Sequence, residues 1–136
     1  MGESKHVRLD WRDGMVFEGR AAEKSPVVLD AGGPEGPSPM EALLLALAGC
    51  TGADVVSILR KRKVGLTSFA VEVDGERRAE HPKRYTAVTL SYRIGAPGLE
   101  EAQARMAIDL SLQKYCSVTH SLASDIAVRY ELALDG

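Results

Sequence analysis

Short segments near the N-terminus alternate apolar and polar residues, a pattern that predicts half-buried β-strands. Residues 7–11 alternate in this way, and Asp13-Gly14 then supplies a turn signal. Residues 15–21 and 26–30 predict two further strands. Residues 31–37 are rich in glycine and proline, which predicts a loop. The N-terminal third is therefore expected to form three short strands.

A helix with a well-marked start is predicted after this loop. Ser38 fits the N-cap position and Pro39 the first helical position. Glu41 fits the third position of a capping box. The helical pattern continues to about Lys63, with Gly65 as a stop signal.

Every position from Ala42 to Gly49 within this helix is apolar. A helix that is apolar all round has to be buried on all sides. A chain of 136 residues with few other elements would struggle to wrap it, so we expect a partner subunit and a homodimer. The apolar segment is far shorter than the roughly 20 residues that cross a bilayer. We therefore expect a core helix and no membrane association.

The second half of the chain shows two strand patterns, two helical patterns and a closing strand pattern. These lie at residues 69–73, 88–94, 99–110, 116–123 and 126–134. The resulting order is three strands, a helix, two strands, two helices and a strand. This order predicts an α+β fold, and we expect a single domain over residues 1–136.

Composition excludes some classes of protein. Hydrophobic residues make up 45% and charged residues 26%, which is ordinary for a globular protein. A formal charge of −2 gives no electrostatic reason to bind nucleic acid or an anionic membrane. The first residues contain no apolar signal segment, so a cytoplasmic location is expected. There, a cysteine pair is more often catalytic or metal-binding than structural.

Two cysteines carry the candidate chemistry. Cys50 lies in the apolar helix, and Cys116 opens the predicted helix at 116–123. A thiol reacts as its thiolate, which helix starts and nearby cations favour. A buried cysteine can also be an inert small hydrophobe, and that alternative stays open for Cys50.

The motifs around these cysteines resemble the osmotically inducible protein C and organic hydroperoxide resistance (OsmC/Ohr) family. They are Ser38-Pro39-Met40-Glu41 leading to Ala48-Gly49-Cys50, and Lys114-Tyr115-Cys116-Ser117-Val118. The resemblance implies an OsmC-like fold, with antiparallel sheets around a long buried central helix in an intertwined homodimer. It also implies a thiol peroxidase that reduces organic hydroperoxides without a cofactor. Cys50 would be the peroxidatic sulfur and Cys116 the resolving one.

That chemistry needs an external dithiol and a cation. A thiolate that attacks a peroxide oxygen becomes a sulfenic acid, a second thiol converts it to a disulfide, and a dithiol then reduces the disulfide. Apolar surroundings disfavour a thiolate unless a positive charge offsets them. The resemblance implies that Arg20 supplies this charge. The alternative is a strand arginine that faces solvent.

The chain departs from the family at the residue that orients the arginine. Many members have a glutamate ten residues before the reactive cysteine, where this chain has Met40. Glu41 comes one place later, and at about 100° per residue it lies on the face opposite Cys50, which favours a capping role. Asp54 shares the face of Cys50 and could hold Arg20 instead. Left unpaired, Asp54 would keep Cys50 protonated; a partly solvated position is the other interpretation.

Cys116 and His120 lie four residues apart at a predicted helix start. This spacing allows a thiol–imidazole contact with His120 as a proton carrier, or two metal ligands. The sequence has no CxxC motif and no third clustered ligand, so we expect no metal. A surface histidine is the simplest interpretation.

We therefore predict a cytoplasmic homodimeric thiol peroxidase acting through Cys50, Cys116 and Arg20. Two alternatives of other classes stay open. One is a non-enzymatic protein whose apolar cavity binds a small hydrophobic ligand. The other is a redox-responsive protein in which a disulfide changes the interaction surface.

Overall fold

The computed structural model describes residues 2–135, whose contacts form two compact units. One unit ends at Leu43 and the other begins at Leu44. The secondary-structure elements follow one another in the predicted order, with one additional π-helical turn. The expectation of a single domain over residues 1–136 stays a prediction.

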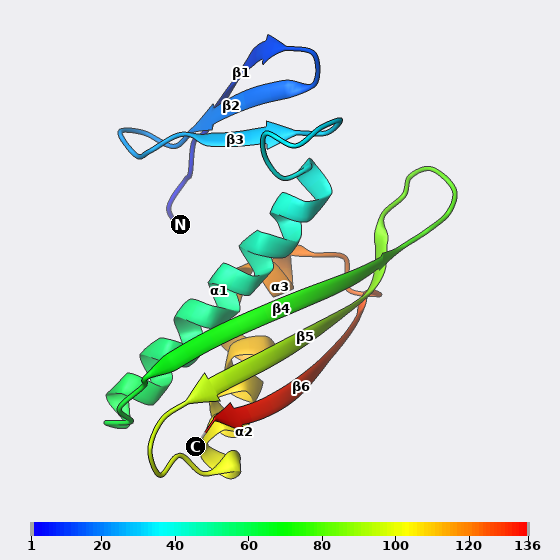
Figure 1. The fold of residues 1–136 in the computed structure, drawn as a ribbon. Coiled ribbons are helices and arrows are strands. Elements are labelled where there is room, and N and C mark those ends of the chain that lie inside the picture. Colours follow the sequence, from blue (N-terminus) through cyan, green and yellow to red (C-terminus); the bar gives the residue numbers. More distant parts are fainter. Residues whose placement is uncertain (1, 136) are drawn as a thin grey trace. The chain divides into compact units, whose positions relative to one another are not determined.

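The N-terminal unit contains an antiparallel sheet of three strands in sequence order (Figure 1). These are β1 (Arg8–Asp13), β2 (Val16–Arg20) and β3 (Val27–Asp30). The buried Asp30 carboxylate accepts hydrogen bonds from the backbone N–H groups of Gly32 and Glu35, at 3.0 and 3.2 Å. These bonds organise the glycine- and proline-rich loop that the sequence predicts.

Helix α1 (Pro39–Lys61) begins at the predicted capping box. The Glu41 backbone N–H donates to Ser38 Oγ at 3.1 Å, and the Ser38 backbone N–H donates to Glu41 Oε1 at 2.9 Å. These reciprocal bonds satisfy two N–H groups that would otherwise lack partners at the helix start. The predicted helix start is confirmed.

The C-terminal unit is built on a sheet of β4 (Ser68–Arg77), β5 (Tyr85–Gly95) and β6 (Ala127–Asp135). Strands β4 and β5 pair antiparallel, whereas β5 and β6 pair parallel. Parallel neighbours need a crossover connection, and the helical segment between β5 and β6 supplies it. The parallel pair is a feature that strand periodicity alone does not predict.

Helices cover one face of this sheet (Figure 1). The buried side chains of β5 alternate along the strand and so share that face; they are Val88, Leu90, Tyr92 and Ile94. Helix α1 approaches so closely at Gly52 that a Cβ there would lie 3.3 Å from the Phe69 ring. Helix α2 (Glu101–Leu110) is tied to the sheet by a bond from Tyr130 to Asp109.

The segment between α2 and β6 holds the additional turn. Helix α2 continues into a π-helical turn, η1 (Ser111–Tyr115), and α3 (Ser117–Ser121) follows. The Cys116 backbone N–H donates to the carbonyl oxygen of Ser111 at 2.7 Å, which is the i→i+5 spacing of a π-helix. Cys116 is therefore the N-cap of α3, one residue before the helix begins.

Within this single chain, α1 buries one face. Its buried residues are Leu47, Thr51, Gly52, Val55 and Leu59. Leu45 is 62% exposed. The whole helix is long and apolar enough to cross a membrane by length and composition, a test that the core helices of soluble proteins also pass. The expectation that a partner covers the exposed apolar face stays a prediction.

Candidate functional site: a two-cysteine centre beside Asp54

Two cysteines and a carboxylate meet in the C-terminal unit. Cys50 and Asp54 lie four residues apart on α1 and so share a face of that helix. Cys116 reaches the same place from the start of α3. The two Sγ atoms and a carboxylate oxygen of Asp54 all lie within 4.8 Å of one another. The structure thus brings together three of the residues that the sequence singled out, although their roles stay predictions.

The Cys116 thiol is enclosed and protonated. Its residue is fully buried, and Sγ accepts a hydrogen bond from the Thr119 backbone N–H at 3.5 Å. Burial raises the pKa of Cys116, the bonds from Thr119 partly oppose this, and the adjacent Cys50 raises the pKa further. Cys50 is half-buried. The two sulfurs therefore lie close together in different surroundings.

A chain of buried hydroxyl groups leads to Asp54. Ser111 Oγ donates to Asp54 Oδ2 at 2.9 Å. A hydroxyl has one hydrogen to donate, so the 2.8 Å contact between Thr51 and Ser111 has Thr51 as donor. By the same argument, Tyr92 donates to Thr51, also at 2.8 Å. All three hydrogens point towards the carboxylate and stabilise its negative charge.

Burial also keeps the Tyr92 hydroxyl at the end of this hydrogen-bonded series protonated. Burial raises the pKa of Tyr92 to about 12, although the bond to Thr51 opposes the shift. Tyr92 therefore remains a hydrogen-bond donor throughout the neutral pH range. The sequence did not predict Thr51, Ser111 or Tyr92 as site residues. The polar position of Thr51 next to Cys50 was the only local signal, because its partners lie 41 and 60 residues away.

A cavity of about 470 Å³ adjoins Asp54. Ile58, Leu110 and Tyr115 contribute apolar parts of its wall, and Lys61 and Arg62 contribute cations. Among the described residues of the C-terminal unit, Asp54 has no ion-pair partner within 4 Å. The carboxylate thus borders a space large enough for a small molecule.

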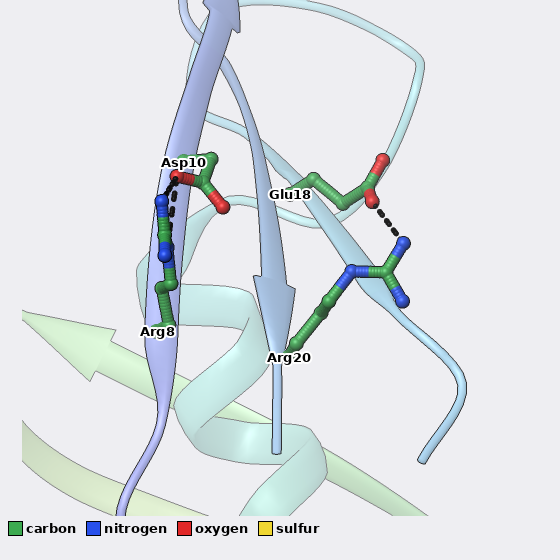
Figure 2. A network of polar contacts seen from close by, with 4 residues as sticks. All are labelled: Arg8, Asp10, Glu18 and Arg20. Atoms are coloured by element: carbon green, nitrogen blue, oxygen red, sulfur yellow. Dashed lines mark hydrogen bonds and ion pairs between the residues drawn. The ribbon is translucent and has the colours of Figure 1, made fainter. Parts of the chain in front are cut away.

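Arg20 belongs to the N-terminal unit, at the end of β2. Its guanidinium donates to Glu18 Oε1, as Figure 2 shows. The N–O distance is 2.8 Å, and the Arg20 side chain is 52% exposed. Glu18 is thus the carboxylate that holds Arg20 within this unit. The predicted action of Arg20 on Cys50 stays a prediction, as does its clamping by Asp54.

The other two candidate residues have local roles. Glu41 forms the capping box, and hydrogen bonds from Ser38 lower the pKa of Glu41. His120 is exposed on α3, and the Cys116 sulfur accepts its hydrogen bond from Thr119 instead. The four-residue spacing in the sequence suggested a contact between Cys116 and His120. In the structure, Cys116 lies instead with Cys50 and Asp54.

Comparison with known proteins places the chain in a family. Residues 32–131 match the family described as OsmC-like protein. The chain belongs to the OsmC-like family. It is 38% identical over 129 residues to Protein YhfA of Escherichia coli (strain K12), covering 93% of this chain and 96% of YhfA.

Solved structures of the OsmC-like family have the same fold. An OsmC-like protein from Mycoplasma pneumoniae superposes with a TM-score of 0.87 at 18% identity, over 100% of both chains. The organic hydroperoxide resistance protein OhrB of Bacillus subtilis gives a TM-score of 0.65 at 13% identity, over 96% of this chain and 98% of OhrB. The predicted α+β, OsmC-like fold is confirmed. At these identities the two structures establish the fold alone.

Proposed function

We propose that this protein is a thiol-dependent peroxidase that reduces organic hydroperoxides through Cys50 and Cys116. The observation that carries the proposal is the approach of the two sulfurs, which lie within 4.8 Å of each other and of Asp54. Membership of a fold family that includes organic hydroperoxide resistance proteins supports it. The proposal includes a cytoplasmic homodimer and an external dithiol reductant.

The reaction balances in three steps. The Cys50 thiolate attacks the terminal peroxide oxygen, the O–O bond breaks, and the alkoxide takes up a proton to leave as an alcohol. The Cys116 sulfur then attacks the sulfenic acid, an S–S bond forms, and water leaves. A dithiol transfers two electrons to the disulfide and restores both thiols.

The different surroundings of the two cysteines support this order of reaction. Cys50 is half-buried and therefore accessible to a substrate, whereas Cys116 is fully buried. Burial raises the pKa of Cys116, so this thiol stays protonated until the sulfenic acid forms. Asp54, within 4.8 Å, is positioned to accept the proton when Cys116 attacks.

Cysteine variants test the proposal directly. The reduced protein is supplied with cumene hydroperoxide and a dithiol, and loss of hydroperoxide is followed. Cys50→Ser should reduce the rate to that of the dithiol alone, because no sulfenic acid can form. Without the dithiol, Cys116→Ser should consume about one equivalent of hydroperoxide, and the persisting sulfenic acid should be trapped by dimedone.

A matched control is Ser117→Ala, which changes an exposed residue next to Cys116 and should turn over like the wild type. Full activity in Cys50→Ser would rule out the proposed chemistry. A Cys116→Ser variant that cycles as fast as the wild type would exclude Cys116 as the resolving residue.

A second candidate function is binding of a small organic ligand without turnover. The cavity beside Asp54 favours it, and so does the carboxylate, whose negative charge disfavours a thiolate nearby. The rate of alkylation by iodoacetamide as a function of pH separates the two functions. A peroxidase should be alkylated rapidly at neutral pH at Cys50, whereas a binding protein should react only when the pH is alkaline.

A further inference from the structure

We propose that the reduced protein binds one Zn²⁺ ion through Cys50, Cys116 and Asp54. The three side chains offer two sulfurs and one carboxylate oxygen, all within 4.8 Å of one another. Thiolates and carboxylates are ordinary zinc ligands, at about 2.3 Å and about 2.0–2.2 Å. In a tetrahedral site such ligands lie about 3.5–3.8 Å apart, so the donors need to approach by at most about 1.3 Å.

The charges of the site favour a dication. All three groups carry negative charge when ionised, and within residues 44–135 Asp54 has no ion-pair partner within 4 Å. Like charges this close oppose one another's ionisation. A Zn²⁺ ion reverses that effect, since it stabilises both thiolates while two protons leave for solvent. The resulting centre carries one net negative charge. Lys61 and Arg62, which line the cavity that Asp54 borders, supply positive charge on that side.

The surroundings hold the carboxylate ligand in place. Ser111 Oγ donates to Asp54 Oδ2 at 2.9 Å, and Ser111 in turn accepts from Thr51. Ser111 and Thr51 are fully buried, so their side chains have little freedom. Hydrogen bonds of this kind orient metal ligands and commonly raise metal affinity by about 10–100-fold.

The cavity of about 470 Å³ reaches Asp54, one of the three proposed ligands. With three protein ligands, a fourth position remains for water, as in open zinc sites. Occupancy and oxidation exclude each other, because a disulfide offers no thiolate to the metal. The site is therefore linked to redox state. This inference goes beyond peroxide reduction and does not depend on it.

The test measures zinc affinity of the full chain without oxygen. Reduced protein competes with a chromogenic chelator for Zn²⁺, and Co²⁺ is used separately because thiolate–cobalt bonds give characteristic charge-transfer absorption. We expect one ion per chain and thiolate–cobalt bands. Cys50→Ser and Cys116→Ser should weaken zinc binding by at least about 100-fold, and Asp54→Asn and Ser111→Ala by at least about 10-fold.

Two variants serve as matched controls and should bind like the wild type. Asp109→Asn removes another carboxylate of the same unit, which accepts a bond from Tyr130. His120→Gln removes the imidazole nearest Cys116 in sequence. Circular dichroism confirms that each variant is folded. The oxidised wild type should lose zinc binding, because a disulfide replaces its two thiols. This control removes the thiols without a substitution.

Three results would overturn the proposal. The first is a reduced wild type that binds zinc no more tightly than its oxidised form. The second is an Asp54→Asn variant with unchanged affinity, which would remove Asp54 from the ligand set. The third is a loss of binding in His120→Gln, which would assign the third ligand to the histidine. Each result is independent of peroxidase turnover.

Discussion

At the scale of single residues, the identity of Asp54 matters most for the chemistry. It lies within 4.8 Å of both sulfurs, and Ser111 holds it by a hydrogen bond. Two unit charges at this distance repel by about 1 kcal/mol in a water-like dielectric and by more in a drier one. A negative charge on Asp54 at this distance opposes formation of a thiolate at either sulfur.

Asp54→Asn should increase the alkylation rate of the metal-free protein at neutral pH by about fivefold. That factor corresponds to about 1 kcal/mol, the lower end of the repulsion, because the site is only partly buried. The measurement is iodoacetamide labelling in the presence of a chelator, followed by mass spectrometry. Asp109→Asn should leave the rate unchanged. A slower reaction in Asp54→Asn would mean that the carboxylate acts as a base for the thiol.

Tyr92 predicts a dependence of stability on alkaline pH. Burial raises the pKa of Tyr92 from 10.0 to about 12 in the folded protein. Between these values the folded state holds a proton that the unfolded state has lost, so the free energy of unfolding falls as pH rises. The contribution is complete below pH 10 and is lost by about pH 12. Its full size is about 2–3 kcal/mol.

Tyr92→Phe removes this contribution. At pH 8 the variant should be less stable than the wild type, because the bond to Thr51 is lost. The difference should shrink by about 2–3 kcal/mol between pH 10 and pH 12, as measured by urea unfolding. Tyr115→Phe, at an exposed position, is the control and should follow the wild type. A constant difference across this range would show that Tyr92 does not titrate as proposed.

At the scale of elements, the start of α1 follows from four residues. The Ser38–Glu41 capping box is readable from the sequence because all its contacts are local. The same residues leave little reason to assign Glu41 a role in catalysis, since its carboxylate is engaged with Ser38. Stability and activity should therefore respond differently to changes in this box.

Ser38→Ala should lower the free energy of unfolding by about 1 kcal/mol, because an N–H group at the helix start loses its acceptor. Ser38→Asp should retain most of the stability. Glu41→Gln should keep the cap, since glutamine also serves at this position, and should keep the rate of hydroperoxide reduction. Urea unfolding and the peroxidase assay give the two measurements. A large loss of rate without loss of stability in Glu41→Gln would assign Glu41 to the active centre.

The strands could be predicted from the sequence, but the way in which they pair could not. Alternation along 88–94 and 126–134 identifies β5 and β6, because one face of β5 is buried and one face of β6 is less exposed than the other. The parallel pairing of these strands depends on a crossover and leaves no mark in either strand. The π-helical turn at Ser111–Tyr115 is likewise invisible to periodicity, since a single i→i+5 turn interrupts no apolar pattern.

The site was predictable only as far as its residues lie near one another in sequence. The four-residue spacing of Cys50 and Asp54 placed them on one face of a helix, and the structure agrees. Their meeting with Cys116 rested on resemblance to a family. The hydroxyl chain could not be anticipated, because Ser111 reaches Thr51 across 60 residues and Tyr92 reaches it across 41. Long-range contacts of this kind require the tertiary fold.

At the scale of the whole molecule, apolar side chains remain exposed in both units. Leu45 on α1 is 62% exposed, and Trp11 on β1 is 67% exposed. Leu9 and Trp11 lie two residues apart on β1 and so share one face of its sheet. Exposed apolar surface of this kind usually marks an interaction site. We propose that a second copy of the chain covers it.

Leu45→Glu should convert a dimer of the wild type into a monomer, since a buried charge at this position would be costly. Sedimentation equilibrium gives the mass of each form. Trp11 is the only tryptophan in the chain. If the second copy covers β1, loss of that copy in Leu45→Glu should shift the tryptophan fluorescence to longer wavelength. Ala102→Glu, at an exposed position on α2, is the control and should leave the mass unchanged. A monomeric wild type at micromolar concentration would contradict the expectation that the apolar face of α1 is a subunit interface. The exposed leucine would then need a different partner.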